Sequence, residues 1–159
     1  IEQIFEEKFI NWPVDKEVLQ ALVAKTFKNF SHDDSRDNKL AVVCPNWDED
    51  RPFILDLFKK VIAFEAEYQD LIAQKTKNWD SERIALMDTL LMRMAITELI
   101  HFPSVPVKVS MNEYIEIAKE FSTPKSNSFI NGILDKILAD LKTAGKVRKV
   151  GKGLIEYID

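Results

Sequence analysis

The stretch from Ser81 to Ile100 reads SERIALMDTLLMRMAITELI, and it decides the fold class. It contains neither glycine nor proline, and its apolar residues lie on nearly all sides of a helix rather than along one stripe. A helix of this kind is typical of the centre of a bundle, where neighbouring helices pack around it. We therefore predict a central helix from about Asp80 to Ile100, with the Asp80 side chain as its N-cap.

Amphipathic stretches on the N-terminal side predict two of the surrounding helices. Apolar residues recur at helical spacing over residues 15–30, where Asp15 is the expected N-cap. They recur over residues 52–72, a stretch that begins with a proline, and proline suits a first helical turn because its missing N–H has no partner there. Residues 31–50 between them are polar and acidic, so we expect a long loop with a short extended piece at 40–43.

Two more helices are predicted after the central one. Ser110 is expected to begin the first of them, because Ser110 and Glu113 form a capping-box pattern. The second is expected over residues 125–143, with an apolar stripe facing inward. The chain is therefore predicted to be all-α, a single-domain helical bundle over residues 1–159.

The basic tail over residues 143–159 differs from the rest of the chain. Three of the four glycines lie in it, and the five bases from Lys142, just before it, to Lys152 have no acid between them. Segments 147–150 and 154–158 are expected to form a small hairpin or an irregular ordered tail. The charge is uneven along the chain, since residues 1–74 hold 15 acids and 9 bases whereas residues 75–159 hold 11 acids and 13 bases.

Composition excludes several classes of protein. No apolar run approaches the roughly 20 residues that a membrane-spanning helix needs. Cys44 is the only cysteine, so neither a disulfide framework nor a cysteine zinc cluster can form within the chain. The sequence starts at Ile1 in the middle of an apolar pattern, and we expect it to be a piece of a longer chain.

Enzymatic chemistry has little support in the sequence. His32 and Asp33 resemble the paired ligands of a metal phosphohydrolase, but His101 is the only other histidine, so a polar loop tip explains them better. Cys44 is better explained as a small apolar residue than as a reactive thiol. We expect no catalytic residue, no metal and no cofactor.

Three features of the last two long helices are open to a binding or a structural interpretation. Arg93 is a charge in the apolar central helix, which either reaches solvent and a neighbouring acid such as Glu98 or faces RNA or a partner. Asn131 and Gly132 interrupt a good helix, for which close helix packing is the simpler explanation. The start of the last helix offers free N–H groups to an anion, or its polar residues merely cap it: Lys125, Ser126, Ser128 and Phe129.

Several stretches resemble the C-terminal signature of the NusB family of transcription antitermination factors. They are AITEL at 95–99, VPVKVSMNE at 105–113, IAKEF at 117–121 and KSNSFINGILD at 125–135. The likeness is close over about 79–138 and weaker back to about residue 53, so a NusB-like core is expected over about 53–142.

The resemblance implies an all-helical, non-enzymatic and cytoplasmic bacterial protein without a cofactor. It implies binding to boxA-type RNA of ribosomal RNA transcripts together with the ribosomal protein NusE, in the RNA polymerase elongation complex. Carried over residue by residue, it implies two groups. The expected RNA or partner contacts are Arg93, Lys108, Lys125, Ser126 and Phe129; the expected structural signature is Asn112, Glu113, Asn131, Gly132 and Asp135.

One departure from the family pattern leaves alternatives open. The family has an arginine-rich N-terminal helix, and residues 1–30 instead hold lysines scattered among acids. The basic tail is expected to compensate for this missing charge. The alternatives are a NusB-like interaction module that does not bind RNA, and an RNA-recruiting domain cut from an rRNA methyltransferase.

Overall fold

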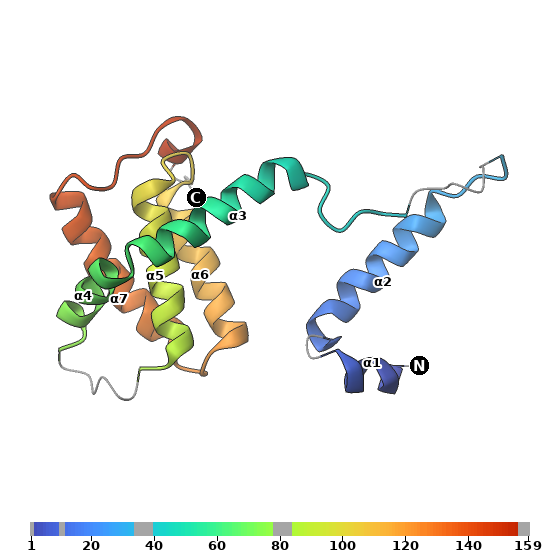
Figure 1. Ribbon diagram of the computed structural model, residues 1–159, viewed down its shortest axis with the longest axis horizontal. Coiled ribbons are helices and arrows are strands. Elements are labelled where there is room, and N and C mark those ends of the chain that lie inside the picture. The colour runs from blue at the N-terminus through green and yellow to red at the C-terminus, as the bar shows by residue number, and fades with distance from the viewer. Residues whose placement is uncertain (1, 10–11, 34–39, 78–83, 156–159) are drawn as a thin grey trace. The chain divides into compact units, whose positions relative to one another are not determined.

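The computed structural model describes residues 2–9, 12–33, 40–77 and 84–155. The chain divides into two compact units, Ile1–Asp50 and Arg51–Asp159, and each is described by itself. The prediction that residues 1–159 form one domain stays a prediction. The all-α prediction is confirmed, since every regular element in the described ranges is a helix (Figure 1).

The first unit contains helices α1 (Glu2–Lys8) and α2 (Trp12–Lys28). Because α2 begins before residue 15, Asp15 lies in its first turn and the prediction that it is the N-cap is wrong. Thr26 is buried; its hydroxyl donates to the Leu22 carbonyl oxygen (2.8 Å) and accepts from the Ala41 backbone N–H (2.9 Å). This side chain ties the segment after the loop back to α2.

The predicted helix over 52–72 is two helices, α3 (Trp47–Ala63) and α4 (Glu65–Lys75). α3 begins before residue 50, so the loop predicted to end there is shorter and the proline is inside the helix. The break at Phe64 has no proline or glycine to signal it, and Phe64 has φ −107° and ψ 17°. Its ring stacks on His101, with 4.8 Å between the ring centroids.

The core of the second unit lies between α4 and three long helices, α5 (Leu86–His101), α6 (Val107–Phe121) and α7 (Ser126–Thr143). α5 contacts α4, α6 and α7, which confirms that it is central (Figure 1). Leu86 in its first turn is 83% exposed, and apart from Asp88 its buried side chains lie between Leu91 and Leu99. The predicted start at Asp80 and its cap lie outside the described residues. The fully buried apolar side chains from these helices include Met92, Ile96, Leu99, Ile130 and Leu134.

The predicted capping box at Ser110 is wrong. α6 begins at Val107, three residues earlier, and its N-cap position is Pro106 without a side-chain hydrogen bond. Ser110 is fully buried, and its hydroxyl donates to the Glu98 carboxylate (2.7 Å). The Ser110 hydroxyl therefore donates to a buried carboxylate and does not cap the first turn of the helix.

The tail forms no hairpin in its described part, which ends at residue 155. It leaves α7, crosses the turn between α5 and α6, and makes one short 3-10 helix, Gly151–Leu154. The Val150 N–H donates to the Pro103 carbonyl oxygen (2.9 Å). Gly153 packs so closely that an added Cβ would lie 2.0 Å from the same oxygen. This close contact with the turn between α5 and α6 gives the described part of the tail the irregular ordered form, one of the two that were predicted. Most of the second predicted segment, 154–158, lies outside the described residues.

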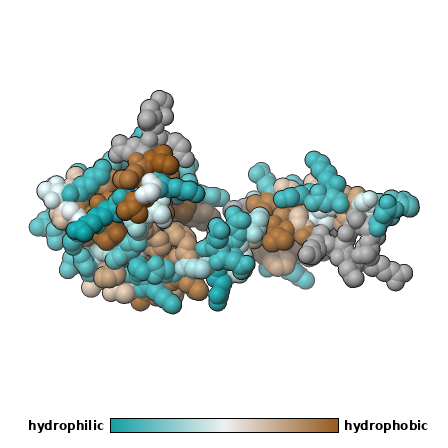
Figure 2. All heavy atoms as spheres, turned by 90° about the horizontal axis from the view of Figure 1, so that it is seen from above, coloured by the Kyte–Doolittle hydropathy of each residue, from teal (hydrophilic) through white to brown (hydrophobic). Residues whose placement is uncertain are grey.

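Hydrophobic side chains also reach the surface in both units (Figure 2). They include Phe27 on α2 and Phe58 on α3. None of the helices in the described ranges has the length and apolar character required to cross a membrane.

Candidate functional site

The first turns of α7 border a hollow of about 500 Å³ on the surface of the second unit. We call it the Lys125 hollow. It combines two lysines with an aromatic ring and apolar carbon, and its lining residues are Pro124, Lys125, Ser128, Phe129, Gly132, Ile133 and Lys136. The sequence prediction of a site at the start of the last helix therefore corresponds to a real concave surface.

The electrostatics of the Lys125 hollow favour an anion. Among the residues that the structure describes, no acid lines it, and Lys125 and Lys136 are both exposed. Lys125 occupies the N-cap position of α7, and no side chain caps the helix there. The Ser126 N–H donates to the Thr123 carbonyl oxygen (2.9 Å) and the Ser128 N–H to the Asn127 side-chain oxygen (2.8 Å). The positive end of the helix dipole, rather than a set of free N–H groups, therefore adds to the two ammonium charges.

A buried carboxylate holds the start of α7 in place. Asp88 on α5 is 5% exposed, and it accepts hydrogen bonds from the hydroxyls of Ser122 and, at 2.8 Å, Ser126. The hydroxyls of Thr123 and Ser126 share a further hydrogen bond of 2.7 Å. The structure thus places Ser126 in the interior, where it positions the turn that carries Lys125 instead of lining the hollow.

The explanation of Gly132 by close helix packing is wrong. A Cβ added at Gly132 would meet nothing within 4 Å, and this glycine lines the Lys125 hollow. Asn131 is exposed and donates to the Asp135 carboxylate (3.3 Å), not to the end of a neighbouring helix. The missing side chain at residue 132 therefore leaves open surface rather than room for another backbone.

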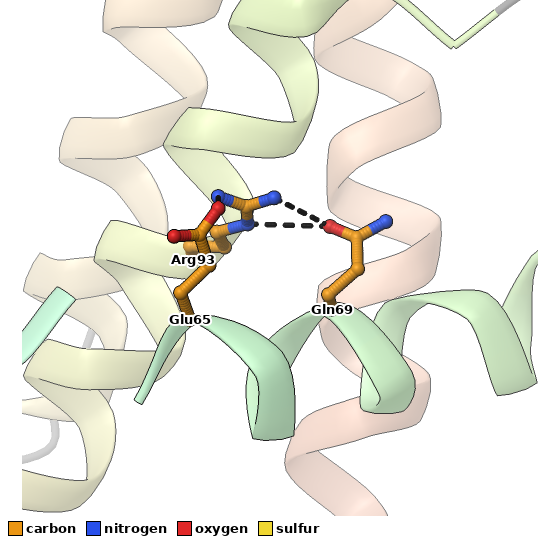
Figure 3. A network of polar contacts seen from close by, with 3 residues as sticks. All are labelled: Glu65, Gln69 and Arg93. Atoms are coloured by element: carbon orange, nitrogen blue, oxygen red, sulfur yellow. Dashed lines mark hydrogen bonds and ion pairs between the residues drawn. The ribbon is translucent and has the colours of Figure 1, made fainter. Parts of the chain in front are cut away.

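Arg93 uses its donors within the second unit. Its guanidinium pairs with Glu65 (2.7 Å) and donates twice to the Gln69 side-chain oxygen (2.8 and 3.2 Å), so that α5 is joined to α4 (Figure 3). The Arg93 side chain is 18% exposed. The expected partner on its own helix, Glu98, is occupied elsewhere.

Glu98 is the centre of a second buried polar cluster. One carboxylate oxygen accepts from Ser110, and the other accepts from the Tyr114 hydroxyl (2.9 Å). Burial, and then the nearby Glu98 charge, raise the pKa of Tyr114, which keeps this hydroxyl protonated as a donor. The cluster joins α5 to α6 from inside.

A further hollow of about 550 Å³ lies between α6, α7 and the tail, and the sequence did not predict it. We call it the tail hollow. Four of the residues assigned to the family signature or to contacts line it, namely Lys108, Asn112, Asn131 and Asp135. These four residues stand out in the sequence because they belong to the family motifs, and the structure brings them to one surface. The tail, which closes the hollow, has no sequence pattern that predicts its place there. Glu113, by contrast, is exposed on α6 outside both hollows.

The residues considered for chemistry form no catalytic arrangement. His32 and Asp33 lie 3.7 Å apart, and both side chains are fully exposed. Cys44 donates to the Asp50 carboxylate (3.0 Å), and this hydrogen bond raises the pKa of the thiol, which disfavours the reactive thiolate. In the described ranges, no three His, Cys, Asp or Glu side chains are grouped so that they could hold a metal ion.

Comparisons with known proteins agree on one family. Residues 16–139 match the NusB family, so the likeness reaches well before residue 53, and the tail lies beyond it. The chain is 38% identical over 154 residues to the transcription antitermination protein NusB of Salinibacter ruber, covering 97% of this chain and 88% of that protein. It is 42% identical over 106 residues to the NusB of Chloroherpeton thalassium, covering 67% of this chain and 50% of that protein.

A solved structure supports the same assignment. The T. maritima NusB structure is similar with a TM-score of 0.55 and 26% sequence identity, covering 77% of this chain and 86% of that one. The sequence likeness over nearly the whole chain and the shared helical fold lead to one conclusion. The chain belongs to the NusB family, a non-enzymatic family of transcription antitermination factors.

Proposed function

We propose that the chain binds boxA-type RNA of ribosomal RNA transcripts together with the ribosomal protein NusE, as part of an RNA polymerase elongation complex. The family assignment supports the general role in antitermination. The observation that carries the RNA proposal is the Lys125 hollow, in which two lysines and Phe129 line one surface and none of the described lining residues is acidic.

The chemistry of this hollow suits single-stranded RNA. Lysine ammonium groups bind phosphates, and an aromatic ring beside them offers a base a surface on which to stack. Sequence-specific proteins read RNA mostly in such unpaired segments, because the bases are then accessible. Lys125 and Phe129 are the proposed contacts, and Lys136 joins them as a residue that the sequence alone did not suggest.

The other expected contact residues take different parts in the proposal. Ser126 acts through the Asp88 carboxylate by positioning the turn before α7. Arg93 acts by joining α5 to α4. Lys108 lies at the tail hollow, apart from the start of α7.

The test is binding of a fluorescent boxA-type RNA to the full chain across a salt series, with and without NusE. Wild type should bind, and NusE should strengthen binding. Lys125→Ala should weaken it and flatten the plot of log affinity against log salt by about 0.7, the contribution of one phosphate contact on a single strand. Lys59→Ala is the matched control, since Lys59 is exposed on α3 away from both hollows.

A second candidate function has its own observation. The first unit holds 11 acids and 6 bases, so it lacks the positive charge that RNA binding favours and suits a basic protein instead. An interaction module without RNA binding would bind NusE normally and leave the RNA free at every salt concentration. That result would contradict the RNA proposal and favour this one.

A further inference from the structure

We propose that single-stranded RNA leaves the Lys125 hollow, crosses α7 at Gly132, and continues into the tail hollow, where the C-terminal tail forms the far wall. This inference rests on the proposed RNA-binding function. It assigns a second RNA subsite and gives Gly132 and the tail a part in recognition.

The two hollows lie on neighbouring faces of α7. Asn131 and Gly132 are consecutive, and one lines the tail hollow while the other lines the Lys125 hollow. Asp135 and Lys136, one turn later, are divided between the hollows in the same way. A ligand that passes from one hollow to the other must therefore cross the ridge formed by this part of α7.

Gly132 lowers that ridge. It has no side chain, and a Cβ placed there would meet open space. A glycine inside a helix is less favourable than alanine by about 1 kcal/mol. Because no backbone among the described residues needs this space, a ligand that passes close to the α7 backbone accounts for the glycine.

The charge of the tail hollow matches an RNA backbone. Lys108, Lys142 and Lys149 line it, whereas Asp135 is the one acid among the described residues of its lining and accepts a hydrogen bond from Asn131. Lys149 is held at the wall by its hydrogen bonds to the carbonyl oxygens of Glu98 (3.4 Å) and Phe102 (3.0 Å). The lysines would attract phosphates.

The floor of the tail hollow suits a base. Met111 and Leu138 present apolar carbon there, and Asn112 and Asn131 supply amide groups that can donate and accept hydrogen bonds. A volume of about 550 Å³ lies within the usual range of ligand sites, roughly 300–1,000 Å³. Cations, an apolar floor and a few amides together are the chemistry that recognises a nucleotide of a single strand.

The ridge is tested by Gly132→Leu, with Ala139→Leu as the matched control. Both changes add a leucine to α7, and residue 139 is exposed two turns later outside both hollows. Gly132→Leu should weaken boxA-type RNA binding about tenfold, in line with the loss of one stacked base, while the midpoint of unfolding stays level or rises. Unchanged RNA affinity in this variant would overturn the inference.

The second subsite is tested by Lys142→Ala against RNAs shortened stepwise from either end, with Lys59→Ala as control. Lys142→Ala should weaken the binding of the longer RNAs. This effect should disappear once shortening from one end removes the nucleotide that occupies the tail hollow. Lys125→Ala should still weaken the binding of that shortened RNA.

The two proposals fail in different ways. If wild type binds no RNA, both are overturned. If Lys125→Ala weakens RNA binding but Lys142→Ala leaves the binding of every RNA length unchanged, only the second subsite is overturned. If Lys142→Ala weakens NusE binding in the absence of RNA and leaves RNA binding unchanged, the tail hollow holds a protein segment, which also overturns it.

Discussion

The two compact units differ in what their apolar side chains do. In the first unit, Val23 and Phe27 on α2 are 55% and 66% exposed, and Thr26 is the only buried residue among those described. In the second, Ile96 and Leu134 are completely buried. Both units have amphipathic helices, so helical pattern and burial are separate properties. Most of the stability of a helix in a protein comes from packing of its apolar face.

The largest expected effect comes from removing matched leucine side chains in the two units. Leu134→Ala should lower the free energy of unfolding by about 2–5 kcal/mol, because it leaves a cavity in the core. Leu19→Ala should cost less than about 1 kcal/mol, since Leu19 is 42% exposed. Urea unfolding of both variants measures the difference. Equal losses in the free energy of unfolding would mean that Leu19 is packed as tightly as Leu134. That result would contradict the difference in packing between the two units.

A smaller effect is expected from removing a buried carboxylate. Glu98→Ala leaves the hydroxyls of Ser110 and Tyr114 without their acceptor, which should cost about 1–3 kcal/mol. Glu17 on α2 is exposed, so Glu17→Ala should change stability by less than about 0.5 kcal/mol. The same urea experiment compares them. An unchanged free energy of unfolding in Glu98→Ala would show that α5 and α6 stay joined without this cluster.

The two histidines give the smallest contrast, which depends on pH. Burial and then the nearby Lys60 charge lower the pKa of His101 below 6.5, and its Nε2 shares a hydrogen bond of 2.8 Å with the Tyr68 hydroxyl. As the pH falls below 6.5, the unfolded chain binds a proton at this residue before the folded chain does. The stabilisation is therefore complete above pH 6.5 and decreases toward the lower folded pKa.

Thermal melts of variants across mildly acidic pH measure this contrast. His101→Gln should reduce the pH dependence of the melting temperature. His32→Gln should leave it unchanged, because the His32 side chain is fully exposed in the first unit. An identical slope in the wild type and His101→Gln would show that other groups cause the acid sensitivity.

The sequence predicted the inner faces of the helices in the second unit well. Dense apolar spacing identified Met92, Ile130 and Leu134 as inward residues, and all three are buried. The start of α7 was also identified as a candidate anion site, since lysine and serine at a helix start suggest a phosphate. Which of these side chains face solvent depends on contacts with Asp88, 38 residues earlier than Ser126, which local pattern does not show.

The wrong predictions share a physical cause. Ser110 matches the capping-box pattern, but a buried carboxylate on another helix competes for its hydroxyl. Gly132 matches a packing glycine, but the space beside it is open. In each case a partner distant in sequence, or the absence of one, decided the outcome.

The contacts of the tail with the turn after α5 impose an order on folding during synthesis. Lys149 bonds the carbonyl oxygens of residues 51 and 47 positions earlier, and Gly153 then fits against Pro103. A ribosome adds about 5–20 residues per second, so these carbonyls are made roughly 2–10 s before their partners. The turn between α5 and α6 therefore lacks its contacts with the tail while α6 and α7 are translated. The tail is translated after α6 and α7, so a nascent chain lacks this wall of the tail hollow until the tail has left the ribosome.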